Sequence, residues 1–330
     1  MKETMQEQLI VQPTTTRTSK KLVGLMSRSK KLKNENFLGY AFIMPFLIVF
    51  LTFSIYPIIK TLMLSFTDYA GYGEPIFNGL SNYQQLLSDP MFYNAFGNTL
   101  KMWGINIVLQ MSLAFVLMLI FSDIKYKMKG LKVYRAIFYL PNLIAATSVA
   151  FLFSSLLDWQ YGSFNQMLMS AGLIDSKINW LGQPGTAIIV VGIIGAWMWF
   201  GSTFIVLMAG VQGISKEYFE AAHIDGANRW QVFTQITLPL LKPILLYVAL
   251  TSFIGGIQMF DIPFLLTDGI GAPFGALNTV VMYLFNTAFK YNNVGYAAAI
   301  AYGLFFVIAI SSVFIFKTMY RSNIKKKGDK

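Results

Sequence analysis

The chain has 330 residues, of which 55% are hydrophobic and only 12% are charged, whereas about 25% are charged in an ordinary soluble domain. It has no cysteine and a single histidine, His223, which excludes a disulfide framework, a thiolate nucleophile, a Cys-type zinc site and a multi-histidine metal centre. Its net charge is +11, but a soluble nucleic-acid-binding protein with that charge would carry far more charged residues. The composition therefore indicates an integral membrane protein.

Residues 1–36 are polar, basic and rich in threonine. A secretory signal peptide would place an apolar core within roughly the first 15–30 residues, and none is found there. We predict a disordered cytoplasmic tail that is attracted to anionic lipid. A regulatory or partner-binding role for this tail is the alternative.

Six apolar stretches of low charge follow, and each is long enough to cross a bilayer core, which needs roughly 20 helical residues. They lie at about residues 37–60, 100–122, 136–157, 187–211, 243–266 and 294–316. We interpret them as six transmembrane helices of an all-α membrane protein. They form one transmembrane domain at residues 37–320, followed by a short basic tail at 321–330.

A seventh charge-free stretch at residues 269–289 is a weaker candidate for a span. Its first half is rich in glycine and contains Pro273, so only about residues 276–289 could be helical, which is short for a span. We expect an external helix that lies on the bundle or dips into it.

The positions of lysine and arginine predict the topology. Of the 26 Lys and Arg residues, 22 lie in four segments: the N-terminal tail, residues 123–135, residues 212–243 and the C-terminal tail. Six spans put all four segments on one side, which must be the cytoplasm. The prediction is therefore six helices with both termini inside.

The cytoplasmic segment 212–243 is unusually long for such a loop. A helix is predicted from Lys216 to Ile224, with Ser215 as its N-cap. Gly226 interrupts the helical pattern, which resumes from Arg229 to about Ile236. Small residues beside carboxylates favour a docking surface for a cytoplasmic partner, while an amphipathic connector on the bilayer is the alternative. The residues concerned are Glu220, Ala221, Ala222, Asp225, Gly226 and Ala227.

The run EAAHIDGANRWQVFTQITLPLLKP, residues 220–243, resembles the EAA loop of permease subunits in binding-protein-dependent ABC importers. The triplet DGA at 225–227, the run YRAIFYLP at 134–141 and the turn LLTDG at 265–269 resemble the carbohydrate-uptake, MalF/UgpA-like branch. The resemblance covers about residues 37–320. The sequence departs from this branch in two ways that bear on which sugar is carried. The large external domain of the maltose permease is absent, and the turn after Asp268 reads GIGAP where GGP is usual.

The resemblance implies a permease fold of the maltose-permease type in the bacterial inner membrane. It also implies that the coupling loop at 212–243 seats in a cytoplasmic ATPase subunit, with Glu220 holding the ATPase and Gly226 forming the corner. The implied partners are a second homologous permease, two ATPase subunits, an extracellular solute-binding protein, the sugar and membrane lipid, and no nucleic acid. The chain contains no G-x-x-x-x-G-K-[ST], so we expect ATP and Mg²⁺ on the ATPases and no cofactor here.

Aromatic and polar residues in the fourth and fifth spans are candidates for a substrate pathway. Aromatic faces stack on sugar C–H surfaces, and hydroxyls and amides bond sugar hydroxyl groups. The same residues also pack against lipid or neighbouring helices, and Asp261 alternatively faces water at the outer mouth. The resemblance implies sugar contacts around 199–202 and 252–259. The candidates are Trp197, Trp199, Phe200, Ser202, Ser252, Gly255, Gly256, Gln258, Met259 and Asp261.

We therefore expect a transport subunit, not an enzyme, that moves a carbohydrate, in particular an oligosaccharide. A permease for glycerol phosphate is the alternative, but it should carry intramembrane Lys or Arg, and the fourth and fifth spans have none. An intramembrane enzyme would need paired carboxylates or histidines at depth. An ion-driven transporter should show broken helices with acidic residues at the midplane, and no such pattern is evident in the sequence.

Overall fold

The computed structural model describes residues 39–121 and 130–324, with side chains to residue 319. The predicted tail at 1–36 lies outside the described residues, and of the tail at 321–330 only the backbone of 321–324 is described. The chain divides at Thr61 into two units, each described by itself. One helix, Gly39–Leu64, runs across that division and is apolar enough to span a membrane. It contains a π-helical turn, η1 (Leu51–Ile55), and continues as α2 (Tyr56–Leu64).

The wide turn η1 comes just before Pro57. A proline inside a helix cannot donate a hydrogen bond to the carbonyl four residues earlier, which is that of Phe53 here, and its ring crowds that carbonyl. A π-turn is one way for a helix to pass such a site without ending.

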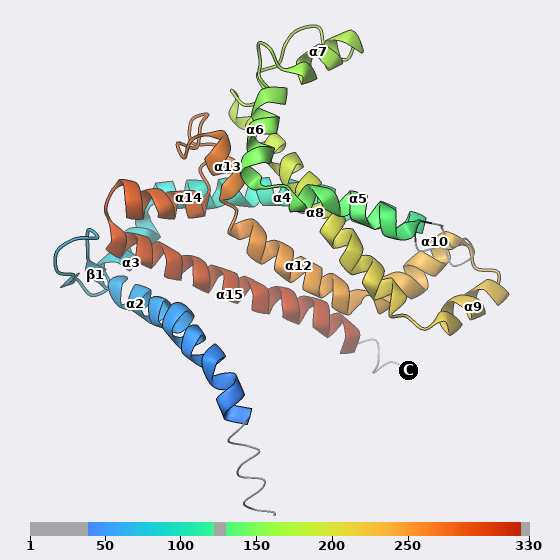
Figure 1. The fold of residues 1–330 in the computed structure, drawn as a ribbon, viewed down its shortest axis with the longest axis horizontal. Coiled ribbons are helices and arrows are strands. Elements are labelled where there is room, and N and C mark those ends of the chain that lie inside the picture. The colour runs from blue at the N-terminus through green and yellow to red at the C-terminus, as the bar shows by residue number, and fades with distance from the viewer. Residues whose placement is uncertain (1–38, 122–129, 325–330) are drawn as a thin grey trace, which may run out of the picture. The chain divides into compact units, whose positions relative to one another are not determined.

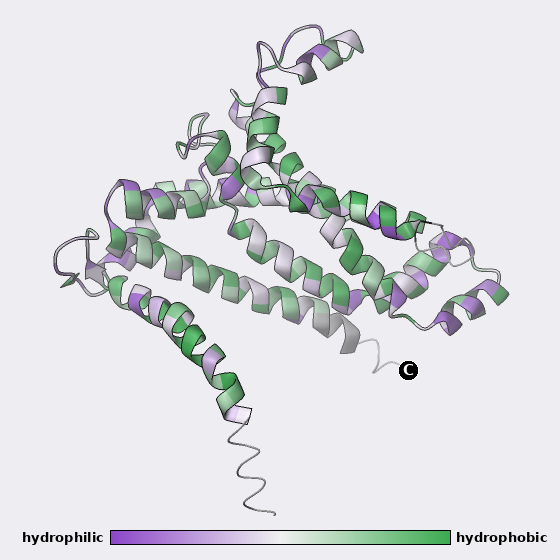
Figure 2. Ribbon diagram, in the orientation of Figure 1, coloured by the Kyte–Doolittle hydropathy of each residue, from purple (hydrophilic) through white to green (hydrophobic). Residues whose placement is uncertain are grey.

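After the last residues of α2, the second unit continues with a short antiparallel hairpin, in which Thr67 pairs with Phe77 and Asp68 with Ile76. Long apolar helices alternate with shorter ones from there on, and Figure 2 shows the apolar residues along the long helices. The elements up to the coupling segment are β1 (Thr67–Asp68), β2 (Ile76–Phe77), α3 (Ser81–Ser88), α4 (Pro90–Phe121), α5 (Leu131–Leu143), α6 (Ala146–Leu156), α7 (Ser163–Ser170) and α8 (Pro184–Gln212). The remaining elements are α9 (Lys216–Ile224), α10 (Arg229–Val232), η2 (Phe233–Thr237), α11 (Leu238–Leu240), α12 (Lys242–Ile257), α13 (Asp261–Leu266), α14 (Val280–Phe285), η3 (Asn286–Lys290) and α15 (Val294–Ile324).

Five helices in the described residues are long and apolar enough to cross a membrane, and a bent pair brings the number to six if it counts as one span. In the second unit these helices are Pro90–Phe121, Pro184–Gln212, Lys242–Leu266 and Val294–Met319. Their positions agree with the predicted spans at 100–122, 187–211, 243–266 and 294–316. In Figure 1, α12 and α15 run side by side, and the two helices are in contact.

The predicted span at 136–157 is not one straight helix. It consists of α5 and α6, which are bent by 86° relative to each other at a short break after Leu143. Pro141 lies inside α5 near its end, where it removes one backbone donor and disfavours helical geometry in the residue before it. The prediction of a continuous third helix was therefore wrong in its shape.

The charge-free stretch at 269–289 contains no helix long enough to span a membrane, as predicted. It is a loop followed by α14 and the π-turn η3. Asp268 and Phe274 adopt left-handed backbone conformations in this loop, and so do Gly269, Gly271 and Gly275. Glycine has no steric penalty there, which explains why the stretch is rich in it.

The close approach of α4 and α8 positions much of this unit. A Cβ atom on Gly192 would lie 2.6 Å from the Ile105 side chain, and one on Gly195 would collide with the Asn106 side chain. Both glycines lie in α8 and both partners in α4, so the small residues allow the two helices to pack closely.

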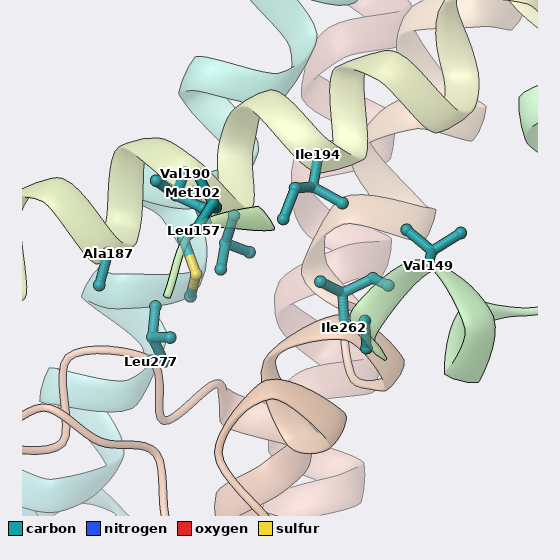
Figure 3. Packing of buried hydrophobic residues seen from close by; sticks show 10 residues of the cluster. Met102, Val149, Leu157, Ala187, Val190, Ile194, Ile262 and Leu277 are labelled. Atoms are coloured by element: carbon teal, nitrogen blue, oxygen red, sulfur yellow. The ribbon is translucent and has the colours of Figure 1, made fainter. Parts of the chain in front are cut away.

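A buried apolar cluster joins α4 and α8 to α6 and α13. In Figure 3, Ile262 of α13 lies against Val149 of α6, while Ala187, Val190 and Ile194 come from α8. Ile262 is the second residue of α13, so this cluster fixes where α13 begins.

Asp89 ties three helices together beside the start of α4. Its Oδ2 accepts hydrogen bonds from the Tyr283 hydroxyl of α14 at 2.5 Å and the Tyr296 hydroxyl of α15 at 2.6 Å. Its Oδ1 accepts the backbone N–H of Met91 at 2.8 Å. Burial raises the pKa of the Asp89 carboxyl, but these hydrogen bonds outweigh burial and hold the pKa below its usual 3.8. Burial and the hydrogen bond to Asp89 raise the pKa of Tyr283 to about 12.

Replacement of Asp89 by Asn should lower the free energy of unfolding by about 1–2 kcal/mol, because hydrogen bonds to a charged acceptor are lost. Since the folded pKa of Asp89 is lowered, its contribution is complete above pH 3.8 and is lost as the pH falls through the folded value. Thermal unfolding of the purified protein, followed from neutral to acidic pH, measures both effects. An Asp89→Asn variant that matches the wild type at neutral pH would contradict the assignment.

Candidate functional site

A cavity of about 440 Å³ lies among α4, α8, α12 and the start of α13. This size falls in the range of small-molecule sites. Its walls combine aromatic, aliphatic and neutral polar side chains. The polar and aromatic residues that line it are Asn106, Gln110, Trp199, Ser202, Thr203, Tyr247, Thr251, Ser252, Gln258, Phe260 and Asp261.

Trp199 is the large aromatic residue that α8 contributes to this lining. Its side chain is 51% exposed in the described chain, so a face of the indole is open to contact. Ser202, one turn further along, donates its hydroxyl to the Trp199 carbonyl at 2.9 Å. An open aromatic face beside hydroxyl groups is a suitable surface for a sugar.

Asn106 and Gln110 of α4 also line the cavity, and sequence reasoning missed both. Gln110 Nε2 donates to the Thr203 hydroxyl of α8 at 2.5 Å, and both side chains are buried. The two α4 residues are four positions apart and therefore share a helix face. Two amides on one face of an apolar span are the signal that could have found them.

The fifth predicted span is interrupted where it reaches the cavity. Helix α12 ends at Ile257 and α13 begins at Asp261, and residues 258–260 between them are not helical. All three line the cavity, and so does Asp261. Non-helical backbone at membrane depth is tolerated where it is buried in protein or lines a hydrated cavity. The break thus brings backbone polar groups, in addition to side chains, to the cavity wall.

The two adjacent glycines of α12 have different surroundings. A Cβ on Gly255 would meet nothing within 4 Å, whereas one on Gly256 would collide with the Trp103 indole of α4. Trp103 also packs edge-on against Phe253 at 5.3 Å between ring centroids. Gly255 therefore leaves open space in the cavity, and Gly256 makes room for a neighbouring helix.

Eight of the ten predicted pathway residues line this cavity, and two do not. Trp197 packs edge-on against Phe153 of α6, with 5.6 Å between ring centroids. Phe200 packs edge-on against Phe138 of α5 at 6.1 Å. For these two residues the structure shows the packing that was the alternative in the sequence. The eight lining residues are Trp199, Ser202, Ser252, Gly255, Gly256, Gln258, Met259 and Asp261.

The segment between α8 and α12 has the predicted helix–corner–helix form. Helix α9 has the bounds predicted from the sequence, Lys216–Ile224. Gly226 forms the corner with a φ of +73°, a conformation that side-chain-bearing residues avoid. Ser215 precedes α9 without a side-chain capping bond. Asn228 and Gln231 form a capping box at the start of α10, which sequence reasoning missed.

The faces of α9 differ from the expectation in one respect. Glu220, Ala221 and Asp225 are exposed, but Ala222 is only 6% exposed, so little of its side chain is available to a partner. Ile224 is 86% exposed and adds apolar surface beside the carboxylates. A groove on this segment is lined by Ala221, Ala222, Asp225, Gly226 and Ala227, among others, whereas Glu220 lies outside the lining.

Comparison with known families identifies the chain. The family described as "Binding-protein-dependent transport system inner membrane component" matches residues 22–326. The chain belongs to this family. The match includes the long helices, the cavity and the segment between α8 and α12, and it confirms the resemblance seen in residues 220–243.

Two curated relatives match over most of their length. The probable ABC transporter permease protein YesP of Bacillus subtilis (strain 168) is 32% identical over 295 residues, which cover 89% of this chain and 94% of that protein. The lactose transport system permease protein LacF of Rhizobium radiobacter is 31% identical over 288 residues, or 87% of this chain and 95% of that protein.

A solved structure has the same fold. It is a bacterial alginate ABC transporter in complex with an alginate pentasaccharide-bound periplasmic protein. One of its chains superposes with a TM-score of 0.76 at 25% identity, and the match covers 88% of this chain and 96% of that chain. A mostly helical ABC permease fold in the cell membrane is thus confirmed, and the hairpin of β1 and β2 is its one departure from an all-α fold in the described residues. The relatives are transport components and not enzymes. The number of six spans and the inward position of both termini stay predictions.

The two glycines of α12 give a matched pair of variants. Gly256→Ala should destabilise the protein by about 1–3 kcal/mol, because the added methyl group overpacks against Trp103. Gly255→Ala should leave stability unchanged or raise it by up to about 1 kcal/mol, because alanine favours helix and the space is open. Thermal unfolding of the two purified variants compares them. Equal stabilities would show that the α4–α12 contact is not as tight as described.

Proposed function

We propose that this chain is a permease subunit of an ATP-driven importer that moves a carbohydrate, an oligosaccharide in particular, by alternating access. The observation that carries the proposal is the cavity, which combines the open indole of Trp199 with neutral hydrogen-bonding groups and an interrupted span. Two of the relatives support a sugar, since LacF is described as a lactose permease and AraP of Bacillus subtilis as an arabinooligosaccharide permease.

The proposed assembly contains four kinds of partner: a homologous permease, two cytoplasmic ATPase subunits, an extracellular solute-binding protein and the surrounding lipid. A binding protein is supported by the family description and by the periplasmic protein in the alginate transporter complex. ATP and Mg²⁺ would be bound by the ATPases, because this chain has no phosphate-binding P-loop sequence.

The segment 212–243 would couple the ATPases to the cavity. Its exposed carboxylates, Glu220 and Asp225, can accept hydrogen bonds from an ATPase, and Ala221 and Ala227 let another backbone approach closely. The corner at Gly226 sets the angle between α9 and α10. Closure of the two ATPases would then tilt the segment and with it the helices that it joins.

A permease for glycerol phosphate remains the alternative substrate class. It is less well supported, because a phosphate would need a cation in the cavity. Of the described residues that line the cavity, none is Lys, Arg or His.

The coupling role predicts that Glu220→Ala and Gly226→Pro abolish uptake but not membrane insertion. Proline holds φ near −65° and has no N–H, whereas Gly226 has a φ of +73° and donates to the His223 carbonyl. Uptake of labelled sugar and the amount of each variant in the membrane are measured together. Asp175→Ala, which removes an exposed carboxylate after α7, is the control and should transport normally. Normal uptake by both coupling variants would refute the role.

The assignment of the pathway predicts that loss of Trp199 impairs uptake, whereas loss of Trp197 impairs protein stability. Trp199→Ala should lower uptake about tenfold or more at unchanged membrane level, because an aromatic anchor in the cavity is lost. Trp197→Ala should instead lower protein stability by about 3–5 kcal/mol, because a packed side chain is removed. Uptake normalised to membrane level separates the effects. Wild-type uptake by the Trp199→Ala variant would contradict the assignment of the pathway.

A further inference from the structure

We propose that this chain selects uncharged saccharides against acidic ones, and that the Asp261 carboxylate is the group that disfavours saccharides with uronic-acid units. The inference rests on the proposed function, because it assumes that the cavity holds sugar. It goes further by naming the charge class of the substrate and the residue that sets it.

The side chains that this chain contributes to the cavity wall include one charged group. Asp261 is the one carboxylate among the described residues that line the cavity, and no Lys, Arg or His accompanies it there. The other polar side chains in the wall are amides and hydroxyls. This chain therefore gives the cavity a neutral wall with a single negative charge.

The neighbours of Asp261 fix the position of its backbone, and no described cation pairs with its carboxylate. It is the first residue of α13, directly after the break in the span. The next residue, Ile262, is buried in the cluster with Val149 (Figure 3), and Phe260 before it stacks on Phe264 at 4.7 Å between ring centroids. Within the described part of the chain, no Lys or Arg forms an ion pair with Asp261. Asp261 is exposed in the described chain and borders the cavity, so it adds a negative charge to the cavity wall without a compensating cation.

An acidic saccharide would meet two costs at this wall. Its carboxylate would lose water without gaining a cationic partner, and it would face a like charge in surroundings of lower dielectric constant than water. A neutral saccharide meets neither cost, and its hydroxyl groups can donate charge-assisted hydrogen bonds to Asp261. Like-charge juxtaposition is a common means of rejecting a wrong ligand.

A protein with the same fold takes up an acidic saccharide. The chain shares its fold with a bacterial importer of the acidic polysaccharide alginate. A shared fold does not imply a shared substrate, because specificity depends on the side chains in the site. The wall described here predicts that this chain and the alginate importer differ in charge selectivity.

The test measures binding to the purified complex of this chain with its native partner subunits. Tryptophan fluorescence is titrated with neutral pentasaccharides, namely maltopentaose, arabinopentaose and xylopentaose, and with an alginate pentasaccharide of equal length. A parallel titration of the Trp199→Phe complex removes the signal that arises in the cavity. We expect at least one neutral series to give a Trp199-dependent signal, with the alginate pentasaccharide about tenfold weaker or more.

The variant Asp261→Asn should reduce this preference to within about threefold, and Asp261→Lys should favour the alginate pentasaccharide. A wild-type measurement at rising ionic strength gives a second readout that needs no variant, because salt screens a Coulombic preference. Equal binding of both classes, or a preference that neither Asp261→Asn nor salt reduces, would overturn the inference but leave the proposed function intact. The absence of any Trp199-dependent signal for every sugar would overturn the proposed function as well.

Discussion

The structure depends on one constraint: a backbone within a membrane must satisfy its own hydrogen bonds, because the hydrocarbon offers it none. The long helices satisfy this rule over most of their length. The non-helical residues 258–260 depart from it, and they line the cavity of about 440 Å³. The Gln258 and Met259 N–H groups donate to the Ile254 and Gly256 carbonyls, and the Phe260 carbonyl accepts the Phe264 N–H, so turn hydrogen bonds satisfy part of this backbone. Its remaining polar groups need water or a polar ligand, and the cavity gives both access to them.

Helix packing by small residues supplies the other walls of the cavity. Gly192 and Gly195 let α8 approach α4 so closely that Gln110 bonds Thr203 within the apolar interior. A buried amide must find such a partner, because an unsatisfied one is costly. The bond fixes the amide of Gln110 at the cavity edge. The close packing of α4 on α8 thus sets the position of the Gln110 amide in the cavity wall.

Much of the fold could be predicted, because hydropathy and charge are local properties of the sequence. The long helices, the bounds of α9 and the corner at Gly226 follow from apolar length, a helix-favouring run and one glycine. Side-chain direction could not be predicted. Trp197 and Trp199 are two residues apart and so lie on nearly opposite faces of α8, and the sequence does not say which face meets the cavity. The break before Asp261 could have been predicted from Pro263. This residue has no N–H and cannot donate a hydrogen bond to the Met259 carbonyl, four residues earlier.

The connectivity relates the two candidate sites to each other. Helix α8 carries Trp199 and ends at Gln212, where the coupling segment begins, and α12 starts after that segment and ends at the break beside the cavity. Trp199 is thirteen residues from the end of α8, which is about 20 Å along a helix. Two walls of the cavity are therefore formed by helices that the coupling segment connects directly (Figure 1). Under the proposed coupling, a tilt of that segment would move both walls together, without any need for the cavity itself to contact an ATPase.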